Sequence, residues 1–301
     1  MRTMILYYNT NSYFFPYLRS STIHCFKVYK KINKITSIIH KIPLVSALAY
    51  GEWIRYLKKY DKIIIFDNVF DKNLAKYLNK QFKGEIFVYS WNTAITSEQK
   101  NKLLSAKRYF PVYSFDREDC KKLGLKYASM VYSRDIVTSI SEKESINEYD
   151  VIFLGWDKGR RKELFDLYCL LKKMSFKCYF LIRGFEKEKL HDDFRITNEN
   201  TPYEEYLQLL NSSSVIIDIQ QKGQEGLTIR MVEAIFFRKK IITNKQDINK
   251  YDFYNSNNIF ILGKDCIDDL KDFIISPYKD IPYEIEKKYD LEYWVDEYFH
   301  K

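Results

Sequence analysis

Short apolar runs alternate with longer amphipathic stretches along the whole chain. Val, Ile, Phe and Tyr dominate the runs, which is typical of buried strands, while the stretches between them repeat at helical spacing. The predicted strands of the first half are 4–7, 62–66, 85–89 and 109–114, with helices at 43–59, 71–81 and 96–106. The second half shows the same alternation, with predicted strands at 151–154, 177–182, 215–219, 240–243 and 259–262.

Strands that alternate with helices predict two α/β domains, each built on a parallel sheet. A polar stretch at 133–149 separates the halves and is the predicted linker. We therefore expect an N-terminal domain over 1–140 and a C-terminal domain over 141–301, with a cleft between them. The 301 residues suit two domains of about 150 residues each. The final aromatic segment, 290–299, is predicted to be a helix.

Composition excludes several classes of protein and leaves others open. The net charge is +9, which permits nucleic acid, an anionic membrane or a phosphorylated substrate as partner. The five cysteines form no C-x-x-C pair and the four histidines are scattered, so the sequence offers no zinc site and indicates a reducing compartment. No run approaches the roughly 18 apolar residues of a membrane span, and the apolar run at the start is too short for a signal peptide.

The segment 224–244, QEGLTIRMVEAIFFRKKIITN, carries the strongest chemical pattern. Its loop precedes a predicted helix that begins near Leu227, and Glu225 and Glu233 stand in an E-x7-E spacing. Backbone amides of such a loop, the positive helix end and the guanidinium of Arg230 suit a diphosphate, and Glu233 suits ribose hydroxyls. Gly226 allows the backbone to approach the ligand closely. Two solvated carboxylates in a charged chain are the plainer explanation of the spacing.

A second basic cluster follows the strand DVIFLG. Lys158, Arg160 and Arg161 gather at the start of the next predicted helix. Cations match the dipole of a helix start poorly unless an anion binds there. The cluster is therefore a second candidate for diphosphate binding, with a solvated helix start as its alternative.

The residues from 202 to 255, and above all QEGLTIRMVEA with KKIITN and YDFYN, resemble the carboxy-terminal half of GT-B glycosyltransferases from bacterial surface-polysaccharide gene clusters. That family carries a Q-x-G-L-T-x-R-x-x-E pattern. The resemblance implies two Rossmann-like domains, a nucleotide-sugar donor held by the second, and a last helix that crosses back onto the first. It makes Arg230 the diphosphate-side arginine and Glu233 the ribose-side glutamate. It adds Lys158, Arg160, Gly226, Leu227 and Thr228 to the donor site.

The same resemblance implies transfer of the sugar to a saccharide acceptor, lipid-linked in such pathways, with the first domain on the acceptor side. Asp67, Trp91, Asn92 and Asp116 follow predicted strands there. An aspartate would deprotonate an acceptor hydroxyl if the reaction inverts, and Trp91 would stack on a sugar. Helix caps and core packing are the alternatives. The E-x7-E spacing favours retention, with Glu225 contacting the sugar and Arg230 stabilising the leaving group.

We expect a cytoplasmic protein in peripheral contact with the inner face of an anionic membrane. We expect no metal, no other cofactor and no nucleic acid partner. Two other classes remain open at this stage. One is a nucleotide-sugar epimerase on the same double fold, and the other is a non-catalytic basic module that binds nucleic acid or anionic lipid.

Overall fold

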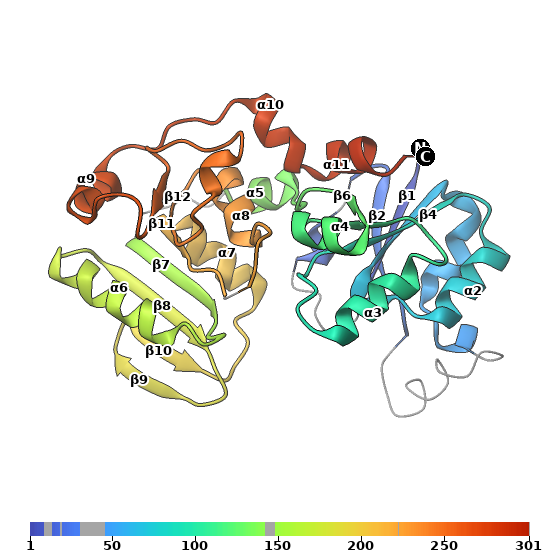
Figure 1. Ribbon diagram of the computed structural model, residues 1–301, viewed down its shortest axis with the longest axis horizontal. Coiled ribbons are helices and arrows are strands. Elements are labelled where there is room, and N and C mark those ends of the chain that lie inside the picture. Colours follow the sequence, from blue (N-terminus) through green and yellow to red (C-terminus); the bar gives the residue numbers. More distant parts are fainter. Residues whose placement is uncertain (9–13, 19, 31–45, 142–147, 222, 301) are drawn as a thin grey trace. The chain divides into compact units, whose positions relative to one another are not determined.

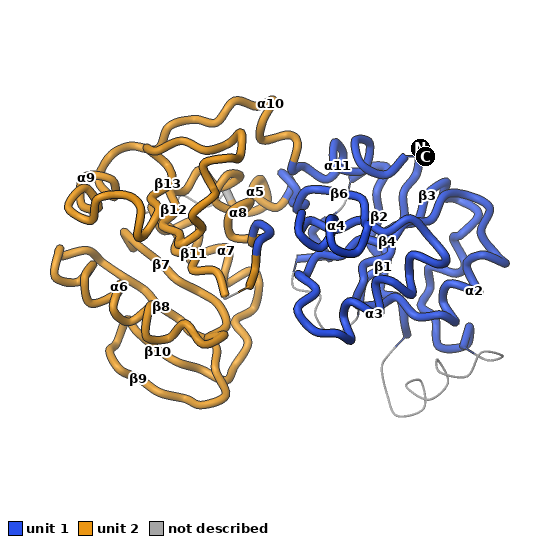
Figure 2. The backbone as a smooth tube through the Cα atoms, viewed as in Figure 1, with its two compact units in different colours: residues 1–135, 225–227, 289–301 blue, residues 136–224, 228–288 orange. Residues whose placement is uncertain are grey.

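The computed structural model divides the chain into two compact units. It describes residues 1–8, 14–18, 20–30, 46–141, 148–221 and 223–300. Unit 1 comprises Met1–Asp135, Glu225–Leu227 and Tyr289–Lys301, and unit 2 comprises Ile136–Gln224 and Thr228–Lys288 (Figure 2). The loop segment Glu225–Leu227 and the C-terminal segment thus group with the first unit although they come late in the sequence.

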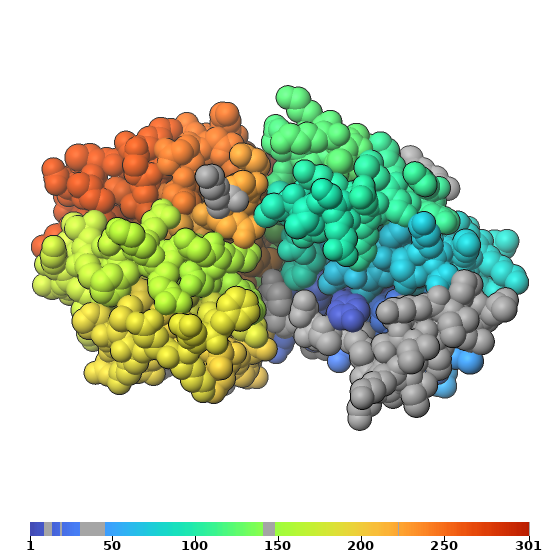
Figure 3. Space-filling model, turned by 60° about the horizontal axis from the view of Figure 1, so that its bottom comes forward, coloured from blue at the N-terminus to red at the C-terminus, as the bar shows by residue number. Residues whose placement is uncertain are grey.

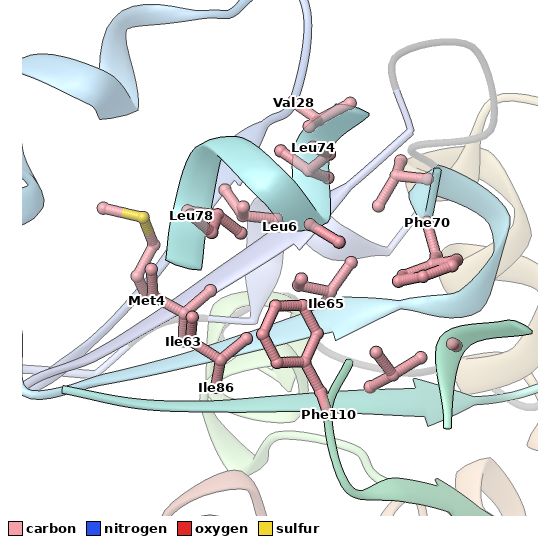
Figure 4. Close-up of a cluster of buried hydrophobic side chains, with 14 of the residues drawn as sticks. Met4, Leu6, Val28, Ile63, Ile65, Phe70, Leu74, Leu78, Ile86 and Phe110 are labelled. Carbon is pink, nitrogen blue, oxygen red and sulfur yellow. The ribbon is translucent and has the colours of Figure 1, made fainter. Parts of the chain in front are cut away.

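Unit 1 is built on a six-stranded parallel sheet in the order β2-β1-β3-β4-β5-β6 (Figure 1). The strands are β1 (Thr3–Tyr7), β2 (Ile23–Lys27), β3 (Lys62–Phe66), β4 (Glu85–Ser90), β5 (Val112–Ser114) and β6 (Lys126–Tyr127). Its helices are η1 (Phe15–Tyr17), η2 (Ser46–Ala49), η3 (Glu52–Lys59), η4 (Asp67–Val69), α2 (Lys72–Gln81), α3 (Ser97–Ala106), α4 (Arg117–Leu123) and the C-terminal α11 (Leu291–Tyr298), while α5 (Arg134–Ser141) spans the boundary. One face of the sheet carries the cluster of Figure 4, in which Met4, Ile63 and Ile86 meet Leu74 and Leu78 of α2.

Unit 2 is built on a seven-stranded sheet in the order β13-β12-β11-β7-β8-β10-β9. All neighbours are parallel except β9 and β10. The strands are β7 (Tyr149–Trp156), β8 (Cys178–Arg183), β9 (Glu188–His191), β10 (Phe194–Thr197), β11 (Ser213–Asp218), β12 (Lys240–Thr243) and β13 (Ile259–Ile261). The helices are α6 (Arg161–Lys173), α7 (Tyr203–Asn211), α8 (Ile229–Phe236), η5 (Ile248–Lys250), η6 (Ile267–Asp269), α9 (Leu270–Ile275), α10 (Tyr283–Glu286) and η7 (Lys287–Tyr289), the last straddling the boundary.

The chain order of unit 2 creates a topological switch point between β7 and β11. From β7 the chain adds strands on one side through β8, and from β11 it adds strands on the other through β12. In open parallel sheets a ligand site lies where the strand order reverses, beyond the carboxyl ends of the strands. The carboxyl ends of β7 and β11 are therefore the expected position of a ligand site.

The structure departs from the sequence prediction in several elements. Residues 46–59 form two 3-10 helices rather than one α-helix, and 43–45 lie outside the described residues. Gly51 separates the two helices because its α-carbon sits against Lys27, where a Cβ would lie 2.5 Å from the carbonyl oxygen. The predicted linker contains helix α5, and its residues 142–147 lie outside the described part. The prediction also omitted β2, β6, β9 and β10.

Strand β9 lies at an outer edge of the unit 2 sheet, and all four of its residues are exposed (Figure 3, yellow). Its sequence EKLH has no apolar alternation, which is why the pattern of apolar positions does not reveal it. Among the described residues no helix is long and apolar enough to cross a membrane.

Candidate functional site

Three cationic side chains gather around the carboxyl ends of β7 and β11 in unit 2. Lys158 and Arg160 follow β7, and Arg230 lies in the first turn of α8. Asp218 ends β11 and is fully buried. The Arg230 Nε atom lies 3.4 Å from Oδ1 of Asp218. Three cations thus surround one fully buried carboxylate, while the carboxylates of Asp157 and Glu163 also act on Arg160.

Gly155 makes room for both arginines. A Cβ at this position would lie 3.2 Å from a terminal nitrogen of Arg230 and 3.4 Å from one of Arg160. Both guanidinium groups also lie over the ring of Phe153, with their central carbons 5.1 Å (Arg160) and 5.4 Å (Arg230) from its centroid. The pattern of strand β7 therefore places an aromatic face and then a glycine directly beneath the two cations.

Arg160 is held by main-chain carbonyls of both switch-point strands. Its Nη2 donates to the carbonyl oxygen of Trp156 at 2.8 Å, and its Nη1 donates to that of Ile219. The side chain is buried, and burial together with neighbouring Arg230 lowers its pKa to about 10. Arg160 thus remains charged at neutral pH, and neutral carbonyls rather than a carboxylate fix its position. It supplies a preset positive field at this site.

Lys158 reaches the cluster from a tight turn. Arg160 N–H donates to the Asp157 carbonyl at 3.0 Å, and Lys158 and Gly159 between them have φ of 48° and 77°. Two consecutive left-handed residues are typical of a type I′ turn, and the left-handed region is costly for lysine. The surrounding protein, Arg160 and Arg230 lower the pKa of the Lys158 ammonium. A bound anion would offset the mutual repulsion of these cations.

Glu233 lies on α8 one turn beyond Arg230 and is fully buried. Tyr203 and Tyr206 of α7 donate hydrogen bonds to its two carboxylate oxygens, Tyr203 at 3.1 Å. Burial raises the pKa of Glu233 to about 7, and these hydrogen bonds and Arg230 oppose the shift. The carboxylate of Glu233 therefore interacts electrostatically with Arg230 of the cationic cluster, while its oxygens are bonded to the two tyrosines.

The remaining predicted donor residues are divided between the units. Glu225 is exposed and groups with unit 1, as do buried Gly226 and Leu227. The Gly226 N–H donates to Oδ2 of Asp116 at 3.1 Å. Thr228 is the N-cap of α8, where its Oγ1 accepts from the Met231 N–H at 3.4 Å.

Of the predicted acceptor-side residues, Asp116 is the N-cap of α4 and is fully buried. Its Oδ1 accepts from the N–H groups of Glu118 and Asp119, and its Oδ2 accepts from Thr93 and Gly226. Four hydrogen bonds occupy this carboxylate, so it is a structural cap and has no oxygen left over for an acceptor hydroxyl. The helix-cap alternative therefore describes its geometry.

Asp67 differs from Asp116 in its surroundings. It begins η4 directly after β3 and accepts a long hydrogen bond, 3.4 Å, from the Trp91 N–H. Burial raises the pKa of its carboxyl to about 6, and Lys102 opposes this. Trp91 is half-buried and packs against Phe14, Phe15 and Phe66, which is core packing, and Asn92 beside it is exposed.

Sequence reasoning missed Asp218, Tyr203 and Tyr206. Asp218 is visible in retrospect as the single carboxylate at the end of the β-branched run VIID. The tyrosines stand three residues apart at the start of a helix and so share one face. Within the described residues no group of three or more His, Cys, Asp and Glu side chains is arranged to hold a metal ion. The metal-free donor site stays a prediction.

Comparisons with known proteins agree on the fold. No protein-family model matches the chain, and no curated protein matches it. Among solved structures, the chain is similar to an alpha-glucosyltransferase in complex with UDP, at a TM-score of 0.60 and 12% identity over 98% of this chain and 97% of that one. It is similar to Anabaena HepE in complex with UDP, at 0.51 and 11% over 99% and 98%. It is also similar to a UDP-forming α,α-trehalose-phosphate synthase from Burkholderia xenovorans, at 0.52 and 9% over 98% and 97%.

These likenesses define the fold class. The neighbours are GT-B glycosyltransferases, and the chain has the GT-B plan of two α/β units on parallel sheets. The fold class predicted from the sequence is thereby confirmed.

Proposed function

We propose that the protein is a glycosyltransferase that moves a sugar from a nucleoside diphosphate sugar to a saccharide acceptor. The observation that carries the proposal is the cationic cluster of Lys158, Arg160 and Arg230 at the switch point of unit 2. Cleavage of a sugar–phosphate bond develops negative charge on the leaving diphosphate. Cations fixed in advance at that position stabilise the transition state more than the ground state.

The three cations differ in how they are held, and we assign each a different role. Arg160 is tied to two carbonyls and provides a fixed positive field, while Arg230, with its side chain 13% exposed, is able to present its guanidinium to two phosphate oxygens. Lys158 is exposed and acts as a mobile point charge. Glu233 then defines the ribose side of the site, one helical turn beyond the diphosphate.

The proposal extends to pathway and stereochemistry. The resemblance of 202–255 supports a role in surface-polysaccharide synthesis with a lipid-linked acceptor, at the inner face of an anionic membrane. The excess of Lys and Arg supports that membrane contact. We propose retention of configuration with Glu225 on the sugar side and no metal ion. Of the acceptor-side aspartates, Asp67 remains the candidate for contact with the acceptor, because hydrogen bonds from the first turn of α4, Thr93 and Gly226 already occupy the Asp116 carboxylate.

The test is release of nucleoside diphosphate from a panel of UDP-, GDP- and dTDP-sugars, with and without lipid-linked saccharide extracts. We expect one donor to be consumed with transfer, and Arg230→Met to lower kcat/KM by about 100-fold or more, as loss of a transition-state charge contact does. Lys121→Met, which removes an exposed cation of unit 1, is the control. Interconversion of the sugar without transfer would establish the epimerase instead, and no reaction with any donor would contradict the proposal.

A further inference from the structure

Helix α7 brings two tyrosines onto the carboxyl group of Glu233. Tyr203 and Tyr206 lie three residues apart and stack with ring centroids 5.7 Å apart and planes 17° apart. Tyr203 Oη donates to Oε1 of Glu233 at 3.1 Å, and Tyr206 Oη donates to Oε2. The two carboxylate oxygens thus each accept a hydrogen bond from a different phenol.

The three side chains differ in their access to solvent. Glu233 has no exposed surface and Tyr203 is 8% exposed, whereas Tyr206 is half-buried. A ligand hydroxyl that approaches this group therefore meets Tyr206 before it meets the carboxylate. A phenol that donates its proton to a carboxylate keeps oxygen lone pairs that accept a second hydrogen bond. Above the Glu233 pKa of about 7, the carboxylate charge strengthens that acceptor, because linked hydrogen bonds polarise one another.

The group is continuous with the cationic cluster. Glu233 and Arg230 share α8, and the charges of Arg230 and Asp218 both act on the pKa of Glu233. In a nucleoside diphosphate the diphosphate is attached to the 5′ carbon of the same ribose that carries the 2′ and 3′ hydroxyls. Glu233, with the α7 tyrosines bonded to it, lies one helical turn from Arg230, which is within reach of the hydroxyls of a ligand whose diphosphate meets Arg230.

We propose that Tyr206 is the residue that contacts the ribose hydroxyls, and that Glu233 is a positioning residue that acts through it. The inference rests on the proposed function and specifies its donor site. It assigns the selection of a ribonucleotide over a deoxyribonucleotide to a tyrosine on α7. Tyr203 anchors the carboxylate from the buried side and contributes to its position only.

The experiment is a calorimetric titration of the whole chain with UDP, GDP and CDP and with the 2′,3′-dideoxy form of each. Wild type, Tyr206→Phe and Tyr203→Phe are compared, and each variant keeps its aromatic ring. We expect the wild type to bind one ribonucleotide about tenfold tighter than its dideoxy form, as one hydrogen bond to a charge-backed group provides. Tyr206→Phe is expected to remove most of this difference by weakening the ribonucleotide alone, while Tyr203→Phe keeps the ratio.

Glu233→Gln supplies a second measurement that does not alter Tyr206 itself. Its amide oxygen is a weaker acceptor than the carboxylate, so we expect a ribo-to-dideoxy ratio between those of wild type and Tyr206→Phe. If Tyr206→Phe keeps the wild-type ratio of ribonucleotide to dideoxynucleotide affinity, whether or not it weakens both nucleotides equally, the inference is overturned. Wild-type binding without discrimination would overturn it and leave the proposed function standing. Failure of all three ribonucleotides to bind would overturn the inference, and failure of CMP and dTDP as well would overturn the proposed function.

Discussion

Arg230 and Asp218 form a partly buried ion pair in which the Nε atom lies 3.4 Å from Oδ1, and the carboxylate has no exposed surface. Within the described residues neither oxygen of Asp218 has a hydrogen-bond partner. The carboxylate therefore acts on Arg230 as a buried counter-charge and orients its guanidinium. It compensates only part of the charge, since Arg160 and Lys158 lie within the same field.

This relationship predicts the effect of Asp218→Asn. Removal of the counter-charge leaves Arg230 without its ion-pair partner, and breaking a buried pair costs about 3 kcal/mol in the free energy of unfolding. Urea denaturation measures this loss, and we expect pyrophosphate to restore more stability in the variant than in wild type. Asp166→Asn breaks an exposed pair with Lys162 and serves as control, with a much smaller expected loss because solvent screens that pair. Equal losses in the two variants would contradict the role given to Asp218.

Gly155→Ala tests the space that both arginines occupy. The added methyl would lie 3.2 Å from the Arg230 guanidinium and 3.3 Å from the Phe153 ring, with Arg160 at 3.4 Å, so the Arg230 guanidinium must shift by a few tenths of an ångström. We expect nucleoside diphosphate affinity to fall severalfold with a near-native thermal midpoint, because positioned charges are sensitive to small displacements. Titration calorimetry and thermal unfolding check the two statements. Unchanged affinity would show that the cluster is not a phosphate site.

Glu233 predicts a specific pH dependence of stability. Its pKa of about 7 in the native state lies above the ordinary glutamate value of 4.5, so the native state binds a proton that the unfolded chain has lost. Stability therefore falls as pH rises from about 4.5 to 7, by about 3 kcal/mol for this group. We expect Glu233→Gln to lose this part of the dependence and exposed Glu225→Gln to keep it. Denaturant midpoints measured across this pH range provide the check, and parallel curves would contradict the buried state of Glu233.

Asp67→Asn separates acceptor contact from donor contact. Asp67 belongs to unit 1 and the cationic cluster to unit 2, so we expect the KM for the acceptor to rise about tenfold while nucleotide affinity stays unchanged. Steady-state kinetics with varied acceptor measures this. Glu98→Gln, an exposed acid of the same unit, is the matched control. A loss of nucleotide affinity in Asp67→Asn would contradict the assignment.

The apolar pattern predicted most of the strands because a parallel sheet buries both faces, and β-branched runs such as KIIIF and VIID are visible without knowing the fold. The helix cap at Asp116 was also predicted, as the alternative to an acceptor-side role, and Asp116 accepts hydrogen bonds from the first turn of α4. The edge strand β9 was not predicted, because its sequence EKLH has no apolar alternation. The inner strand β10 does alternate, with Phe194 and Ile196 buried, but its four residues were too short a run to be recognised.

The site was predictable only in part. Lys158, Arg160 and Arg230 were identified from local spacing, and the fold brings all three around Asp218. That carboxylate could not be found in this way, because its pairing depends on a contact between the end of a strand and the next helix. The partners of Glu233 lie 27 and 30 residues earlier in the chain, and no local pattern reports such a pairing.

Calorimetric titration of the protein with UDP, GDP, CMP and dTDP, repeated on Arg230→Ala and Lys158→Ala, tests the donor site most directly. Wild type is expected to bind one nucleotide at micromolar concentration, and both variants are expected to lose that binding because each removes a cation from the cluster at the ends of β7 and β11. Binding that is indifferent to both substitutions, or the absence of binding by all four nucleotides, would contradict the account and favour a basic binding module.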